Sequence, residues 1–195
     1  MQKIFYVMVF VVAMAMFSMI LPYPVLSNQT NLTKQQVFEI NNHFETELQN
    51  TSNQSPKILD LDWHYIDSIL SLDSEFAIID LTTEASFYVQ RTGGTNHADI
   101  EVQNKDNSEI LSNICQDFSW ERRPVLVVLN DNAYLPASLC IYPHGFSENN
   151  IMNGHLCLHF KNSKTHGTNK IDEKHQKTIK NAEKIGKNYI KNIEK

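Results

Sequence analysis

Residues 153–160 read Asn-Gly-His-Leu-Cys-Leu-His-Phe, and this stretch has the alternation of a β-strand. Side chains on a strand point to opposite faces every two residues. His155, Cys157 and His159 are therefore expected on one face of the strand. The other face is expected to carry the apolar side chains of Leu156, Leu158 and Phe160. A thiol between two imidazoles on one strand face indicates a chemical site rather than simple packing.

Further histidines flank this strand in the sequence. His144-Gly145 precedes it and His166-Gly167 follows it, so both loops can fold over the face that carries Cys157. Two chemistries need several imidazoles around one cysteine. One is a thiolate nucleophile that a histidine activates, and the other is a zinc site.

A polar, glycine-rich segment, Arg-Thr-Gly-Gly-Thr-Asn-His-Ala-Asp at residues 91–99, leads into another alternating strand. His97 and Asp99 lie two residues apart and share a face of that strand. One of them could orient the other, or both could bind a metal ion. The simpler interpretation is a tight turn followed by an aspartate at the strand edge.

A charged segment, Trp120-Glu121-Arg122-Arg123, stands before a strongly apolar strand. A guanidinium there could receive a substrate carboxylate through a bidentate hydrogen bond, with Trp120 beside it. The simpler interpretation is a solvated charge cluster that the tryptophan anchors. We expect Arg122 or Arg123 at the rim of a pocket. The expected lining of that pocket is His97, His144, His155, Cys157, His159 and His166.

The rest of the chain predicts a β domain with peripheral helices. Strands are expected over residues 76–81, 86–91, 97–102, 124–129, 134–142 and 153–160. Short helices are expected from Asp62 and over residues 106–116. The order of these elements predicts an α+β fold in which the sheet is mostly antiparallel.

The end of the chain, from about Asp172, predicts an amphipathic helix. Apolar residues recur three or four apart along it, at Ile179, Ala182, Ile185, Tyr189 and Ile193. Lysines occupy the rest of its surface. The simpler interpretation is a solvated helix face, and the alternative is contact with an anionic wall polymer or lipid.

The N-terminus has the layout of a secretory signal peptide. A short basic start is followed by an apolar run from Ile4 to Leu21, two prolines and the small residue Ser27. We expect residues 1–27 to be a signal peptide, with an uncleaved membrane anchor as the alternative. Residues 28–58 are expected to be a polar segment or linker, and residues 59–195 one globular domain. The chain is therefore expected to be secreted or associated with the cell wall.

Three cysteines, Cys115, Cys140 and Cys157, leave at least one thiol unpaired. Cys115 and Cys140 fall in a helical and an apolar strand pattern, where a buried cysteine is common. A disulfide between these two remains an alternative. Cys157 is the cysteine that we expect to be free.

The motifs named above resemble a domain of secreted Gram-positive bacterial proteins, over residues 76–177. The residues that carry this resemblance are Arg91-Thr92-Gly93-Gly94, His97-Ala98-Asp99, Trp120, Arg122-Arg123, Pro143-His144-Gly145, Gly154-His155, His159-Phe160 and Thr165-His166-Gly167. This resemblance does not define an activity.

A His-Gly step followed by His-x-Cys also resembles the active-site pattern of bacterial L,D-transpeptidases. That resemblance implies Cys157 as nucleophile, His155 as its base and His144 as a residue that positions the substrate. Such enzymes form a thioester with a peptidoglycan stem peptide and pass the acyl group to an amine or to water. The pattern departs from the family at Leu156, where the family has glycine, and at His159, where it has Arg or Asn.

Three functions follow from these patterns. The first is a secreted cysteine acyl-transferase or peptidase without a cofactor, in which Cys157, His155 and His144 act and His159, His97, Asp99 and His166 support them. The second is a zinc hydrolase with ligands among His97, Asp99, His155 and His159. The third is a module that binds the cell wall without catalysis. The expected partner is peptidoglycan or another wall polymer. No segment resembles a nucleic-acid module, and membrane contact is expected only through an uncleaved N-terminus.

Overall fold

The computed structural model describes residues 55–115, 119–147 and 151–193 of the chain, which belong to one compact unit that begins at Ser55. Its elements, in chain order, are β1 (Lys57–Ile58), α3 (Trp63–Ile69), β2 (Glu75–Asp80), β3 (Ser86–Gly93), β4 (Ala98–Val102), α4 (Lys105–Ile114), β5 (Arg122–Asn130), β6 (Ala133–His144), β7 (His155–His159) and α5 (Glu173–Ile193). The expected α+β fold with a mostly antiparallel sheet is confirmed.

The hairpin of β2 and β3 follows from local sequence. Ile78 pairs with Phe87, and both side chains are fully buried on the same face. The turn between the strands is organised by Asp80, whose Oδ1 accepts hydrogen bonds from the backbone N–H groups of Thr82 and Thr83. An aspartate that bonds to its own backbone two residues further on is a common turn device.

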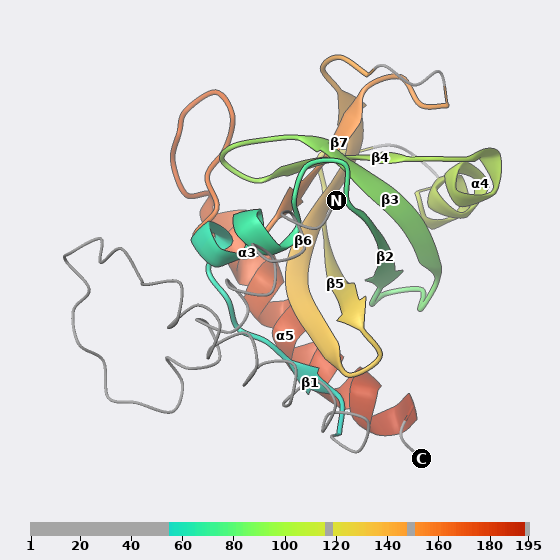
Figure 1. Cartoon of the computed structure of the whole chain (residues 1–195), viewed down its shortest axis with the longest axis vertical. Coiled ribbons are helices and arrows are strands. Elements are labelled where there is room, and N and C mark those ends of the chain that lie inside the picture. Colours follow the sequence, from blue (N-terminus) through green and yellow to red (C-terminus); the bar gives the residue numbers. More distant parts are fainter. Residues whose placement is uncertain (1–54, 116–118, 148–150, 194–195) are drawn as a thin grey trace, which may run out of the picture. The chain divides into compact units, whose positions relative to one another are not determined.

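The sheet closes into a six-stranded barrel. Its strand order is β1-β6-β5-β2-β3-β4-β7, and β7 also pairs with β6. Figure 1 shows β7 lying next to both β4 and β6. The short β1 adds in parallel to the open edge of β6. Residues 57 and 58, which the sequence assigns to the linker, therefore belong to the domain.

The inner face of the sheet forms the core of the barrel, and the outer face packs against the C-terminal helix. Leu139, Leu156 and Leu158 are fully buried on the inner face, where Leu139 and Leu158 are direct cross-strand partners. On the outer face, the C-terminal helix packs across β5 and β6, and its Gly186 lies against Leu126. A Cβ at Gly186 would stand 2.9 Å from Leu126, so the glycine permits close packing of helix on strand.

The remaining helices lie at the periphery, as expected. Helix α4 begins after Asn104, whose side chain accepts a hydrogen bond from the backbone N–H of Asn107. The sequence places this start at Asp106, but the amide oxygen of Asn104 caps the helix and starts it earlier. Cys115 follows the helix as its C-cap. Cys115, Cys140 and Cys157 are all free thiols, so the alternative of a disulfide between the first two is not met.

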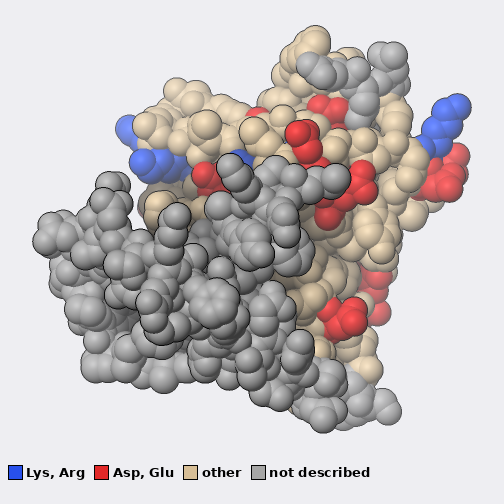
Figure 2. Space-filling model, in the orientation of Figure 1, with Lys and Arg blue, Asp and Glu red and all other residues tan. Residues whose placement is uncertain are grey.

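Expectations for the N-terminus lie outside the described residues, since these begin at residue 55. This applies to the signal peptide over 1–27 and to most of the linker over 28–58. In the part that the structure describes, no helix is both long and apolar enough to cross a membrane. Acidic side chains are spread over the described part of the face drawn in Figure 2, with basic side chains at its two sides.

Candidate functional site

The histidine-rich face of β7 is the outer face of the barrel, the same face on which α5 packs. Asp99 on β4, Cys157 on β7, Cys140 on β6 and Arg122 on β5 are successive cross-strand partners. Directly opposed residues point to the same side of a sheet. These four side chains therefore form one row across four strands, although they come from distant parts of the sequence.

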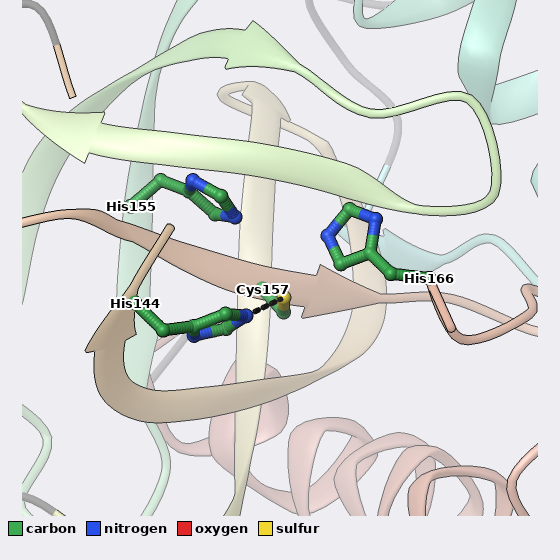
Figure 3. A group of neighbouring side chains, drawn as sticks. All are labelled: His144, His155, Cys157 and His166. Carbon is green, nitrogen blue, oxygen red and sulfur yellow. Dashed lines mark hydrogen bonds between the residues drawn. The ribbon is translucent and has the colours of Figure 1, made fainter. Parts of the chain in front are cut away.

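Two imidazoles approach the thiol of Cys157. The Nε2 atom of His97 lies 3.1 Å from its Sγ, and the Nε2 atom of His144 lies 3.3 Å from it. His97 stands directly before β4, and His144 is the last residue of β6. Figure 3 shows the ring of His144 pointing at Cys157, with His155 and His166 nearby.

Backbone carbonyls fix the orientation of three rings. The Nδ1 of His97 lies 2.6 Å from the carbonyl oxygen of Lys164, and that of His144 lies 2.8 Å from the carbonyl oxygen of Tyr142. The Nδ1 of His155 lies 3.3 Å from the carbonyl oxygen of residue 146. A carbonyl can only accept, so each Nδ1 carries the proton. In the neutral form of each ring, Nε2 then presents a lone pair to the site.

Asp99 faces three of the histidines. Its Oδ1 lies 3.0 Å from Nε2 of His166, 3.5 Å from that of His97 and 3.6 Å from that of His155. Among the described residues, neither Oδ1 of Asp99 nor Nε2 of His155 has a hydrogen-bond partner, although both atoms are buried. Two acceptors that face each other without a proton are a costly arrangement unless something electropositive lies between them.

Burial opposes charge at this site. It raises the pKa of the Cys157 thiol well above its ordinary value, and the charges of Asp99 and Cys140 raise it further. It also lowers the pKa of His97 to about 4, so this ring is neutral near pH 7. A thiolate that a histidine activates needs a lowered thiol pKa, and the burial of both groups opposes this here.

The site has the donor atoms of a metal centre. His144, His155, Cys157 and His166 form one group whose four ligand atoms all lie within 4.8 Å of one another. A second group has the same property and consists of His97, Asp99, Cys157 and His166. The two groups share Cys157 and His166, so they are two alternative donor sets within one cluster. This cluster could hold a metal ion.

Two glycines allow the loops to come this close. Gly145 has a φ of +71°, and a Cβ there would lie 2.5 Å from the ring of His155. Gly154 has a φ of +105°, and a Cβ there would lie 2.6 Å from the backbone oxygen of His144. Both positions need a residue without a side chain, for conformation and for space. They bring His144 and His155 together although ten residues separate them.

His159 does not join the donor groups, although the sequence places it in the site and among the metal ligands. Its ring is buried and stacks between those of His97 and His175, with centroid distances of 4.0 and 3.7 Å. Its Nδ1 lies 3.0 Å from the hydroxyl of Ser163. His159 therefore supports the ring of His97 from behind.

The side chains of the two expected arginines point to opposite faces of β5. Arg122 lies on the face of the site, where it pairs with Asp172 at 3.1 Å. Arg123 instead forms a bidentate ion pair with the buried Asp80, at 2.7 and 2.9 Å. Successive residues of a strand point to opposite faces. Arg123 therefore has a structural partner, and only Arg122 borders the candidate site.

One positioning residue has no signal in the sequence that identifies its role. Arg91 is buried, and its guanidinium bonds to the carboxylate of Asp67 and to the carbonyl oxygens of Leu70, Gly93 and Gly94. It thereby shapes the loop that carries His97. The sequence marks Arg91 only by its place shortly before two glycines.

Comparisons with protein-family models, with curated proteins and with solved structures find no match for this chain.

Proposed function

We propose that this chain is a zinc-dependent hydrolase of the bacterial cell wall, with zinc held around Cys157. The observation that carries this proposal is that the atoms around Cys157 offer more lone pairs than there are protons to share between them. Three rings, those of His97, His144 and His155, turn Nε2 inward because Nδ1 donates to a carbonyl. Asp99 adds a buried oxygen, Oδ1, which makes no hydrogen bond of good geometry among the described residues although Nε2 of His166 lies 3.0 Å away. A divalent cation held by Cys157, His144 and His155 would satisfy the lone pairs of two of these rings.

The kinds of donor favour zinc over other divalent ions. Imidazole, thiolate and carboxylate are the groups that bind zinc in proteins, whereas magnesium and calcium prefer oxygen alone. A coordinating thiol loses its proton outright. Zinc at Cys157 would thus supply the positive charge that the buried site otherwise lacks.

We assign Cys157, His144 and His155 as ligands, because a catalytic zinc site has three protein ligands and one open position. A zinc ion held there would lower the pKa of a water at the open position to near 7. The pair of Asp99 and His166, 3.0 Å apart, would accept and return the proton of that water. His166 is the most exposed of the cluster, as expected of a group that meets substrate.

The substrate we propose is an amide bond of a peptidoglycan stem peptide. This rests on the secretory layout of residues 1–27 and on the resemblance to L,D-transpeptidases and to a domain of secreted Gram-positive proteins. The protein would then act outside the cytoplasm, at the cell wall.

A second candidate function is cysteine-dependent acyl transfer to an amine or to water. It is favoured by the distance of 3.3 Å between Sγ of Cys157 and Nε2 of His144. The ring would take the thiol proton as sulfur attacks the stem-peptide carbonyl, giving a thioester, and would return that proton to the leaving amine. Burial of the thiol and its raised pKa weigh against this candidate.

Metal analysis and turnover together test the two candidates. Protein purified without chelator should contain about one equivalent of zinc, and Cys157→Ala and His155→Ala should contain roughly a tenth of that or less. Cys115→Ala is the matched control, since Cys115 is equally buried but remote, and should keep its zinc. Release of peptide from purified muropeptides should stop with EDTA and return with zinc. Turnover that survives EDTA but not Cys157→Ala would reject the zinc hydrolase and support acyl transfer.

A further inference from the structure

Three aromatic rings meet at the mouth of the candidate site. Trp120 stacks on Tyr142 with a centroid distance of 4.7 Å and tilts against His144 at 5.1 Å. Trp120 is 56% exposed and Tyr142 is 40% exposed. We call Trp120 and Tyr142 the aromatic ledge. It adjoins the centre directly, because His144 touches both Trp120 and Cys157.

Packing within the domain does not account for the ledge. The other tryptophan of the chain, Trp63, is 8% exposed and stacks on Phe160, as a ring of the core does. Trp120 keeps more than half of its surface in water, and its ring contacts among the described residues are with Tyr142 and His144. Single exposed aromatics are ordinary, but adjoining ones beside a candidate site mark a binding surface.

The charges around the aromatic ledge restrict the charge that its ligand can carry. Arg122 lies at the ledge, where it donates to the carbonyl oxygen of Trp120 and is paired with Asp172. The chain carries a formal net charge of −5. Single-stranded nucleic acid also stacks on aromatic rings, but it needs a positively charged groove along its backbone. A ligand that carries strong negative charge therefore does not fit this surface.

We infer that the aromatic ledge binds a neutral pyranose ring of the wall glycan, an N-acetylated amino sugar, next to the peptide that the centre cleaves. Trp and Tyr join an apolar face to a polar edge. A pyranose has the matching form, with an apolar face of C–H groups and a rim of hydroxyls. This inference rests on the proposed function, and it makes the substrate a stem peptide still attached to its sugar.

The test is a titration of the protein with a soluble tetramer of N-acetylglucosamine. Intrinsic fluorescence reports on Trp120, since the chain has two tryptophans and the other is buried. Calorimetry gives the affinity of each variant independently of that signal. Trp120→Ala should bind at least about tenfold more weakly, the loss that one stacked ring explains. Tyr88→Ala is the matched control, because Tyr88 is a 62% exposed aromatic residue on β3. This variant should bind the tetramer as tightly as the unchanged protein does.

Three results would overturn the inference. Trp120→Ala and the unchanged protein could bind the tetramer equally well, or neither protein could bind it. In the third result, a sugar-free stem peptide binds in a way that depends on Trp120, while the tetramer does not bind. The experiment distinguishes failure of this inference from failure of the proposed zinc-hydrolase function. Protein treated with EDTA should still bind the tetramer, and Trp120→Ala should keep its zinc.

Discussion

Asp99 and Cys157 are direct partners across the ladder of β4 and β7, and both side chains lie on the outer face of the barrel. A carboxylate beside a thiol opposes ionisation of that thiol, since it raises the thiol pKa. Burial raises the thiol pKa most and Asp99 raises it further, so both decide how Cys157 should react in the absence of metal.

The first prediction concerns thiol reactivity. In protein freed of metal, Cys157 should react with iodoacetamide at pH 7.5 no faster than Cys115, because the thiolate is the reactive form and burial disfavours it. The pKa of Cys115 is likewise raised by burial, to about 11. Peptide mapping after timed alkylation measures both rates, and urea-unfolded protein gives the unhindered rate for each. Selective, rapid alkylation of Cys157 in the folded protein would contradict this prediction and favour acyl transfer.

The second prediction concerns the two glycines that bring His144 and His155 together. Gly145→Ala and Gly154→Ala should each destabilise the domain by about 2 kcal/mol, because each combines a positive φ with a clash. Both should also weaken zinc binding. Gly167→Ala is the matched control, since a Cβ there meets nothing within 4 Å. Urea unfolding and competition with a chelator measure the two effects, and a Gly145→Ala variant with unchanged zinc affinity would show that the ring of His155 is not a ligand.

The third prediction separates His155 from His159, which alternate on one strand. His155→Gln should lose zinc and, compared in the metal-free state, should change stability little, because its Nε2 has no hydrogen-bond partner among the described residues and its Nδ1 contact is long, at 3.3 Å. His159→Gln should keep zinc but lower stability by about 2 kcal/mol, because the ring packs between two others and bonds to Ser163. Zinc content and thermal unfolding measure this difference. Equal loss of zinc in the two variants would place His159 among the ligands.

The sequence predicts the local elements of this fold well. Alternation over residues 76–81 and 86–91 predicts the hairpin, which the structure forms as β2 and β3. The amphipathic pattern from Asp172 predicts α5, and alternation at 153–160 predicts β7 with Cys157 beside His155 and His159. These predictions succeed because period and turn chemistry are properties of neighbouring residues.

The closure of the barrel has no such local signal. The pairing of β7 with both β4 and β6 sets Asp99 beside Cys157, although 57 residues separate them. The sequence therefore suggests which side chains belong to the site, but not that His159 turns to Ser163 or that Arg123 pairs with Asp80. The partners of His159 and Arg123 depend on the course of the loops and on which face of each strand packs against the helix.

The last prediction concerns Asp80 and Arg123, whose ion pair lies apart from the site. Asp80 is fully buried, and its carboxylate bonds twice to the guanidinium. Burial alone would raise the pKa of Asp80, but hydrogen bonds from Arg123 and Thr83 outweigh it and hold that pKa below its ordinary value. A carboxyl group whose folded-state pKa is depressed stabilises the fold above its unfolded pKa, which is about 3.9. That contribution is lost as the pH falls through the lower, folded value.

Asp80→Asn should therefore lower the free energy of unfolding by about 3 kcal/mol at pH 7, because it leaves the partly buried guanidinium of Arg123 without its counter-ion. The gap between the variant and the unchanged protein should narrow as the pH falls below about 4. Asp80→Asn combined with Arg123→Met should recover part of the stability at pH 7, since no unpaired charge remains. Urea unfolding at pH 7, 5, 4 and 3 would measure all three proteins. A gap that stays constant over this range would mean that the carboxylate charge of Asp80 does not stabilise the domain.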